Sequence, residues 1–368
     1  MSVQKRGPRA WRVRWTEGDR WRSRTFELKR DADAFDADLR RRRRLGTLAD
    51  LDAGTESLDT YVTGTWALTY APLLAPKTRS LYIGPYDGHI APTLGPVRLR
   101  QLTPELIGRW QADRLAAGAG PVAMHKALTL LGNMLQRAVE GGHIPSNPAR
   151  LVRRATLPRR AEVRPLAPAT VEAMRTTSSP RDATLLSVLA YGGLRPGEAL
   201  ALRWGDVRDR TLLVQRSVSL GAEKATKTGR HRTVRLLAPL AADLREWRLR
   251  SGRPDDDALI FPGVDGRPWT EPAYQSWRRR AFARALTAAS VQHARPYDLR
   301  HSFASLLLHE GRSVIYVARQ LGHGAALTLS TDGHVIDELE SVPNQDAETT
   351  ILAARGSSAA PELPIMAN

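Results

Sequence analysis

The stretch from Ala183 to Arg203 constrains the fold of this chain more than any other. Ala183 to Tyr191 is apolar and predicts a buried helix. Gly192-Gly193 ends this helix. Pro196 suits the first position of a new helix, where the missing N–H of proline costs nothing. Arg195 is therefore expected to project from a tight turn at the N-terminus of a helix.

An arginine in this place has the surroundings of an oxyanion site. A guanidinium can donate two parallel hydrogen bonds, and free N–H groups at a helix N-terminus favour an anion such as phosphate. Glu198 in the first turn complements the positive end of the helix. The alternative is an arginine that only caps a surface turn.

A second basic segment favours the oxyanion site. Pro296 to Leu308 predicts a helix, and Arg300 lies at the edge of its apolar stripe. The stripe contains Leu299, Phe303, Leu306 and Leu307. The tripeptide Leu321-Gly322-His323 follows further along the chain.

The charge of the chain is consistent with a polyanionic partner. The 368 residues carry a formal net charge of +17 and a pI near 10.9, which favours nucleic acid. The alternative is a soluble protein that simply uses Arg in place of Lys. The chain has no cysteine, which excludes disulfides, thiolate metal sites and cysteine nucleophiles. No signal peptide or membrane-length apolar run is apparent, so we expect a cytoplasmic protein.

The basic segments together resemble the catalytic domain of the tyrosine recombinases, the phage-integrase family. This family carries G-L-R-x-x-E, K-T-G, H-x-x-R-H and L-G-H boxes and a T-Y-x-H segment with the nucleophile. The matching segments, in the same order, are Gly193–Glu198, Lys227–Gly229, Tyr297–His301 and Leu321–His323. Tyr297 stands where the first His of the third box is usual. The resemblance covers roughly residues 165 to 335, and weaker similarity reaches the N-terminus.

The resemblance implies a role for each matching residue in phosphoryl transfer on DNA. Arg195 and Arg300 would clamp the phosphate oxygens, since each guanidinium is a rigid fork. Lys227, on a mobile hairpin, would protonate the leaving 5′ oxygen. His323 and Tyr297 would hydrogen-bond the phosphate. No metal or cofactor is implied, because the cationic side chains do what Mg²⁺ does elsewhere. The alternatives are a solvated turn lysine for Lys227 and a structural helix-end histidine for His323.

The nucleophile position departs from the family pattern. In the segment Thr328 to Val335, Asp332 occupies the place of the nucleophilic tyrosine. A carboxylate would be repelled by the phosphodiester, and its attack would give a labile acyl phosphate. We therefore expect this form to be deficient in cleavage. Tyr316, in an apolar helical stretch, is the nearest other tyrosine and the only stand-in that we consider.

Residues 1–45 predict a small module of their own. Two basic strands, Trp11–Trp15 and Trp21–Phe26, alternate with a period of two and would form a hairpin. Asp31 would cap a helix that buries Ala32, Phe35 and Leu39. A basic sheet with a supporting helix resembles the arm-type DNA-binding module of integrases. The arginine run Arg40–Arg44 is expected to be a solvated linker or to neutralise phosphates.

The remainder divides into a helical domain and a mixed domain. Residues 46–57 read as a linker, and residues 58–150 predict an all-α domain, interrupted by Pro85, Pro92 and Pro96, that resembles the core-binding domain of integrases. Two of its helices would start after Thr103, a cap, and at Ala123. The basic linker 150–165 leads into the catalytic domain, residues 165–340, which the family makes α/β and mainly helical.

Two parts of the last domain carry further expectations. Strands at Thr211–Ser219 and Thr233–Leu236 would flank a turn, Lys224–Arg230, with Lys227 at its tip. In the tail 341–368, residues 347–354 would form a helix docked on a neighbouring protomer or would be disordered.

These observations support a site-specific DNA recombination protein that binds att-like sites. The first alternative is an inactive, integrase-derived DNA-binding or regulatory protein. A metal-dependent nuclease is a third, and the lack of an acidic cluster in the boxes argues against it. The partner would be double-stranded DNA, with a tetramer on DNA and a monomer or weak oligomer when free. An excisionase or a host DNA-bending protein is a candidate accessory partner. We expect no membrane association, and a place in the cytoplasm at the nucleoid.

Overall fold

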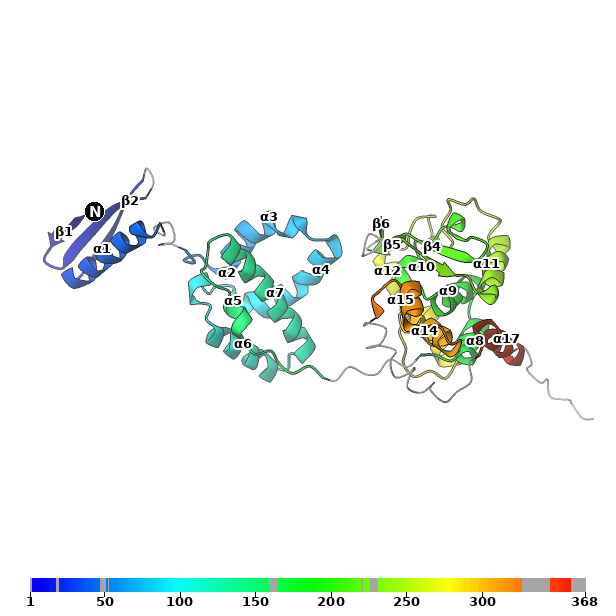
Figure 1. Cartoon of the computed structure of the whole chain (residues 1–368). Helices are drawn as coiled ribbons and strands as arrows, with labels where there is room; N and C mark the ends of the chain where they lie inside the picture. The colour runs from blue at the N-terminus through cyan, green and yellow to red at the C-terminus, as the bar shows by residue number, and fades with distance from the viewer. Residues whose placement is uncertain are drawn as a thin grey trace, which may run out of the picture. The chain divides into compact units, whose positions relative to one another are not determined.

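The chain forms two units, Met1–Arg160 and Ala161–Asn368. The structure is a computed structural model (Figure 1). The residues that it describes are 2–17, 20–46, 51, 53–158, 165–219, 221–225, 231–325 and 345–358. No helix within these ranges is long and apolar enough to span a membrane.

The first unit begins with a three-stranded antiparallel sheet and one helix (Figure 1). The elements are β1 (Ser2–Gly7), β2 (Ala10–Glu17), β3 (Arg20–Phe26) and α1 (Lys29–Arg44). Val13 and Trp15 on β2 are buried with Ala32 and Leu39 of α1, so the predicted alternation and helix are confirmed. The sequence reasoning missed β1, which pairs with β2 along its length.

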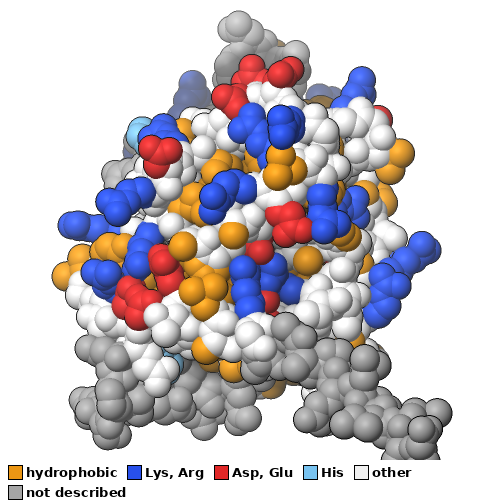
Figure 2. Space-filling view, turned by 90° about the vertical axis from the view of Figure 1, so that its right-hand side faces the viewer, with side chains coloured by type: hydrophobic (Ala, Val, Ile, Leu, Met, Phe, Trp, Pro, Cys, Tyr) orange, Lys and Arg blue, Asp and Glu red, His pale blue; other side chains and the backbone are white. Residues whose placement is uncertain are grey.

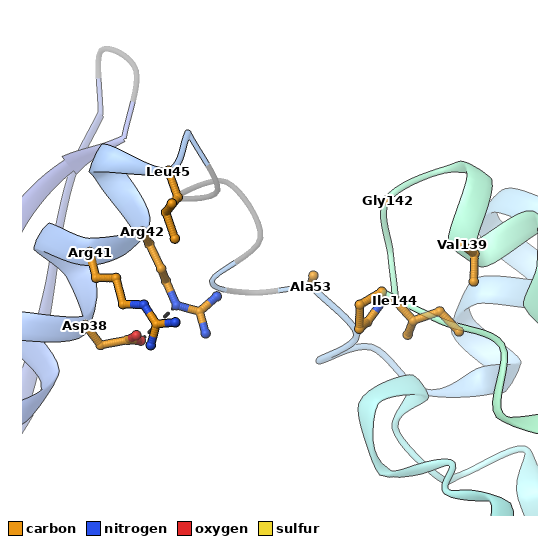
Figure 3. A pocket seen from close by; sticks show the side chains of 9 residues that line it. Asp38, Arg41, Arg42, Leu45, Ala53, Val139, Gly142 and Ile144 are labelled. Atoms are coloured by element: carbon orange, nitrogen blue, oxygen red, sulfur yellow. Dashed lines mark hydrogen bonds and ion pairs between the residues drawn. The ribbon is translucent and has the colours of Figure 1, made fainter.

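Two expectations for α1 are wrong. The helix begins at Lys29, and Leu28 occupies the N-cap position without a side-chain cap, so Asp31 lies in the first turn and does not cap. The arginine run is not a linker, because α1 continues to Arg44. Carboxylates one turn earlier pair with two of these arginines, at 2.7 Å between Asp36 and Arg40. Asp38 and Arg42 are 2.8 Å apart (Figure 3).

The rest of the first unit is all-α, as expected. Its α-helices are α2 (Leu58–Tyr61), α3 (Ala67–Thr69), α4 (Pro76–Pro85), α5 (Ala91–Leu94), α6 (Pro104–Ala116) and α7 (Pro121–Glu140). Short 3₁₀ or π turns join them at η2 (Val62–Trp66), η3 (Ala71–Leu73), η4 (Tyr86–Ile90), η5 (Leu99–Gln101) and η6 (Pro148–Leu151). The Thr103 cap is confirmed: its Oγ1 accepts a hydrogen bond from the amide of Leu106 at 3.1 Å.

Two helix boundaries in this domain differ from those predicted. The helix expected at Ala123 begins earlier, at Pro121. Pro85 is the last residue of α4, and η4 runs directly from it to α5, whose first turn contains Pro92, so the helical path continues through both prolines. Pro96 lies after the end of α5, as expected. Proline is tolerated in a first turn because the N–H groups there have no partner within the helix.

The second unit is mixed α/β and mainly helical, which confirms the predicted fold class. Its α-helices are α8 (Pro168–Thr176), α9 (Pro180–Tyr191), α10 (Pro196–Ala199), α11 (Ala238–Arg250), α12 (Glu271–Trp277), α13 (Ala283–Ala288), α14 (Leu299–His309), α15 (Val314–Leu321) and α17 (Ala347–Ser358). Two shorter turns are η7 (Trp204–Asp206) and η8 (Arg278–Phe282). Helix α9 is buried along almost its whole length and packs against α8, α11 and α14. The predicted buried helix before Gly192 is therefore confirmed.

Two short antiparallel ladders accompany these helices. The strands are β4 (Thr211–Val214), β5 (Arg216–Ser219), β6 (Ala222–Ala225) and β7 (Arg232–Arg235). β4 pairs with β7, as expected, and β5 pairs with β6. The predicted strand Thr211–Ser219 is therefore two strands with different partners, separated at Gln215. Lys224 belongs to β6 and not to the turn that was expected to contain it.

Helix α17 packs on its own unit, beside α8 and α11 (Figure 1). Ala347 and Ile351 are fully buried in the core of that unit. Arg355 reaches two buried carboxylates, with its Nη2 2.7 Å from Asp243 Oδ2 and its Nε 3.4 Å from Glu172 Oε2. The segment 347–354 is therefore helical, and it is docked within this chain.

Candidate functional site

The predicted turn at Arg195 is confirmed, but the amide of Arg195 itself is not free for an anion. Arg195 takes an extended conformation before α10, and its own N–H donates to Glu198 Oε2 at 2.9 Å. Helix α10 has only four residues and begins with Pro196, which has no N–H. The group in this turn that is best suited to bind an oxyanion is therefore the guanidinium of Arg195, which is about one-third exposed.

Gly193 is required for the approach of this turn to α14. Its φ is +61°, in the left-handed region that favours glycine. A Cβ at this position would lie 2.3 Å from the ring of Phe303 on α14. The turn and the helix that carries Arg300 thus pack directly against each other.

Glu198 is a buried carboxylate shared by two arginines. Its Oε1 accepts from Arg195 Nη1 at 2.8 Å, and both of its oxygens accept from Arg232, at 3.0 and 2.8 Å. Burial alone would raise the pKa of Glu198, but the hydrogen bonds and charges of Arg232 and Arg195 outweigh burial and lower the pKa to about 2. The carboxylate therefore stays ionised at neutral pH and fixes both cations.

Arg300 is buried, and not at the edge of the apolar stripe as expected. Only 1% of its surface is exposed. Its Nη1 donates to the carbonyl of Gly193 at 2.6 Å, and its Nη2 donates to the carbonyl of Leu321. Arg300 thus joins the first box to the last. The stripe itself is as predicted, because Leu299, Phe303, Leu306 and Leu307 are all buried.

The charge of this cluster favours an anion. Burial, together with the positive charges of Arg195 and Arg232, lowers the pKa of Arg300 to about 9. Three guanidinium groups gather around the single carboxylate of Glu198, so the cluster carries excess positive charge. A phosphodiester next to these groups would offset their mutual repulsion.

Arg232 is the cluster member that the sequence reasoning missed. It is the first residue of β7 and lies on the same strand face as Val234, which is fully buried. A cation on the buried face of a strand needs a buried anion. That alternation, Arg-Thr-Val, was the signal available in the sequence.

The Leu321-Gly322-His323 segment ends α15 beside this cluster. Gly322 takes φ +68°, and a Cβ there would lie 2.8 Å from the side chain of Arg232. His323 follows directly, and its Nδ1 lies 3.2 Å from the carbonyl oxygen of Gly324. Tyr297 lies two residues before α14, is 40% exposed and contacts the ring of His301 edge-on.

Three sequence expectations cannot be placed next to this cluster. Lys227 and Asp332 lie outside the described residues. Tyr316 is half-buried on α15, packs against the core of the second unit and has Arg312 over its ring. Among the residues that are described, no group of three His, Asp or Glu side chains could hold a metal ion.

On the face of the molecule in Figure 2, Lys and Arg side chains are spread among Asp and Glu side chains and do not gather in one patch. The cluster around Glu198 is distinguished by its buried, shared contacts.

Comparison with known proteins decides the family. The phage integrase family profile matches residues 165–331, which include the four matching boxes and end just before Asp332. The tyrosine recombinase XerC of Xanthomonas axonopodis pv. citri is 30% identical over 225 residues, which are 59% of this chain and 69% of that protein. The chain belongs to the phage integrase family of tyrosine recombinases.

Similarity to other integrases extends beyond the matched segment. A putative prophage phiRv2 integrase of Mycobacterium tuberculosis is 27% identical over 347 residues, which are 90% of this chain and 88% of that protein. Lambda integrase has the same fold. A dimer bound to a COC' core site gives a TM-score of 0.60 at 17% identity over 93% of this chain and 96% of that one. A tetramer bound to a Holliday junction gives 0.57 at 16% over 88% and 95%.

Proposed function

We propose that this integrase-family chain is a site-specific DNA recombination protein that binds att-like sites in duplex DNA. The convergence of Arg195, Arg300 and the 321–323 segment around Glu198 is the observation that carries the proposal. Two guanidinium groups held by fixed partners can grip the non-bridging oxygens of one phosphodiester. The integrases of similar fold were solved on DNA, as a dimer on a core site and as a tetramer on a Holliday junction.

In the chemistry that we propose for the site, Arg195 and Arg300 stabilise the charge that develops on the phosphate. With a tyrosine at position 332, its deprotonated phenolic oxygen attacks the phosphorus and forms a 3′-phosphotyrosyl bond. The bond to the 5′ oxygen breaks, and that oxygen takes a proton from Lys227. His323 and Tyr297 donate hydrogen bonds to the same phosphate. The 5′ hydroxyl of a second strand then attacks the phosphotyrosyl phosphorus and displaces the phenol. The strands are therefore rejoined without an external energy source.

Asp332 favours a second candidate function, an integrase-derived protein that binds DNA without cutting it. An aspartate at the nucleophile position is anionic and shorter than a phenol, and it cannot form a phosphotyrosyl bond. Both candidates share the same DNA-binding surface. They differ in whether residue 332 can carry the covalent step. We propose binding as a tetramer on paired sites, with an excisionase or a host bending protein as accessory.

Selection from a pool of random duplexes tests the shared part of the proposal. Repeated capture by the native chain is expected to enrich one sequence with two inverted half-sites, because a symmetric pair of chains reads a symmetric site. Nuclease protection of that duplex should cover both half-sites. Recovery of unrelated sequences that bind no better than the starting pool would contradict site-specific binding.

A further inference from the structure

Arg232 lies where three parts of the site meet. It begins β7, five residues after Lys227 in the sequence. Its side chain is only 12% exposed. Because β7 pairs with β4, with Arg232 opposite Val214, the backbone of Arg232 is held in a ladder. The backbone position of Arg232 is therefore fixed, and its guanidinium extends into the cluster around Glu198.

All three nitrogens of the Arg232 guanidinium donate hydrogen bonds. Nη1 and Nη2 donate to Oε1 and Oε2 of Glu198 at 3.0 and 2.8 Å, a bidentate pair. Nε donates to the carbonyl of Gln320 at 2.9 Å. One side chain thus contacts both the helix that follows Arg195 and the end of the helix that leads to His323.

Each of these contact partners also contacts, or lies next to a residue that contacts, one of the two phosphate-clamping arginines, Arg195 and Arg300. Glu198 holds the backbone amide and the guanidinium of Arg195. Gln320 precedes Leu321, whose carbonyl accepts from Arg300. Gly322, the next residue, packs its backbone against the Arg232 side chain. A shift of the Arg232 side chain would therefore displace Arg195, Leu321, which accepts from Arg300, and Gly322, which precedes His323.

We propose that Arg232 is a positioning residue that ties the Arg195 turn and the 320–323 segment to the strand leading from Lys227. This inference rests on the proposed function, because positioning is meant with respect to a phosphodiester. Arg232 does not itself contact the reacting atoms. It sets the distance and angle between the groups that do.

Lysine cannot replace arginine in this role. A single ammonium has no planar fork, so it cannot bridge both oxygens of Glu198 and also reach the Gln320 carbonyl. Arg232→Lys keeps the positive charge and loses the geometry, whereas Arg232→Gln loses both. The two variants therefore distinguish the effect of the Arg232 charge on DNA binding from its effect on the alignment of Arg195 and Arg300.

The first measurement determines the dissociation constant for DNA and the rate of covalent adduct formation separately. The chain carries Asp332→Tyr, and the probe is a nicked duplex with the sequence selected by the native chain. Arg232→Lys is expected to leave the dissociation constant within about threefold, while the rate of covalent adduct formation at saturating DNA falls roughly tenfold to a hundredfold. Arg232→Gln should lower that rate at least as much and weaken binding as well. An unchanged rate in both variants would overturn the proposal.

Arg235→Gln is the matched control. Arg235 is on the same strand and is also ion-paired, with its Nη1 2.7 Å from Glu310 Oε1, but its side chain reaches neither Glu198 nor the Gln320 carbonyl. Its adduct rate is expected to stay within about twofold of the parent. An equal loss in Arg235→Gln would mean that any ion pair on β7 has this effect, which also overturns the proposal.

The second measurement needs no DNA. Hydrogen exchange of the native chain and its Arg232→Gln variant compares the amides of 195, 197–200 and 321–323 with those of α9. Faster exchange in both segments, with α9 unchanged, is expected if Arg232 ties them together. Unchanged exchange in either segment overturns the proposal. If the Asp332→Tyr parent forms no adduct, the proposed cleavage chemistry fails, and hydrogen exchange alone decides on Arg232.

Discussion

At the scale of single residues, Glu198 links stability to pH. Its pKa is about 2 in the folded chain, compared with 4.5 for an unperturbed glutamate. A lowered carboxyl pKa stabilises the fold above pH 4.5, and this contribution is lost as the pH falls from 4.5 toward 2. Glu198→Gln should therefore lower the free energy of unfolding by about 3 kcal/mol at pH 7. Urea unfolding at pH 7 and pH 3 should show a smaller difference at the lower pH.

Glu246→Gln provides the control for this prediction. Glu246 also pairs with an arginine, Arg250, at 2.7 Å, but both side chains are more than half exposed. Such surface pairs contribute about 0–1 kcal/mol. A loss at Glu198 that is no larger than this, or one that is the same at both pH values, would contradict the role assigned to the buried carboxylate.

The two clamp arginines should respond differently to truncation. In a chain with Asp332→Tyr, Arg195→Ala and Arg300→Ala are each expected to cost about 2–4 kcal/mol of transition-state stabilisation. Arg300→Ala should also destabilise the fold by about 1–3 kcal/mol, because the carbonyls of Gly193 and Leu321 lose their donor. Adduct formation and urea unfolding measure the two effects. Either variant cleaving at the parental rate would show that the clamp is wrongly assigned.

Much of the cluster could be predicted from residue patterns, and the rest depends on tertiary contacts. The Gly-Gly break and Pro196 located the turn at Arg195 correctly, because both act through local backbone geometry. Burial of Arg300 was missed, since its partners are carbonyls far away in the sequence. Arg232 was missed because its bidentate partner, Glu198, lies 34 positions away. Lys227 and Asp332 lie outside the described residues and stay predictions.

At the scale of elements, α17 is held to its unit by a buried ionic network. Arg355 and Arg175 share Asp243 and Glu172, and Ser187 Oγ donates to Asp243 Oδ2 at 2.7 Å. Arg355→Ala leaves these carboxylates with less compensation, so the free energy of unfolding should fall by about 3 kcal/mol. Urea unfolding of the full chain measures this effect.

An exposed arginine pair supplies the comparison for α17. Arg250→Ala removes a pair with Glu246 in which both side chains are more than half exposed, and it should cost about 0–1 kcal/mol. Equal losses for Arg355→Ala and Arg250→Ala would mean that the network contributes nothing to the docking of α17.

The elements predicted best were those set by local signals. Thr103 capped its helix as expected, because a threonine before Pro-Glu satisfies a free amide by itself. The α1 cap was misplaced, since the charged run extends the helix in both directions from Asp31. The Thr211–Ser219 strand was predicted as one piece, because β-branched residues cannot show that the two halves pair with different partners.

At the scale of the whole molecule, the net charge of +17 predicts strongly salt-dependent DNA binding. Each phosphate neutralised contributes about 0.9 to the slope of log K against log salt for duplex DNA. Arginines on the N-terminal sheet, on α1 and in the Arg195 cluster would each add to this slope. Titration of the selected duplex from low to physiological salt should give a steep line, and a flat one would contradict DNA binding by all of these parts.

The most direct test of the account is a denaturing gel of the chain on a nicked duplex that carries the selected site. The central claim is that an integrase centre is present and that residue 332 decides whether it cuts. The native chain and an Asp332→Phe control, which has the ring without the hydroxyl, should give no covalent adduct. Asp332→Tyr should give a slower-migrating protein–DNA band. An adduct from the native chain would mean that the nucleophile lies elsewhere, with Tyr316 the first residue to examine, and no adduct from Asp332→Tyr would contradict a cleavage-competent centre.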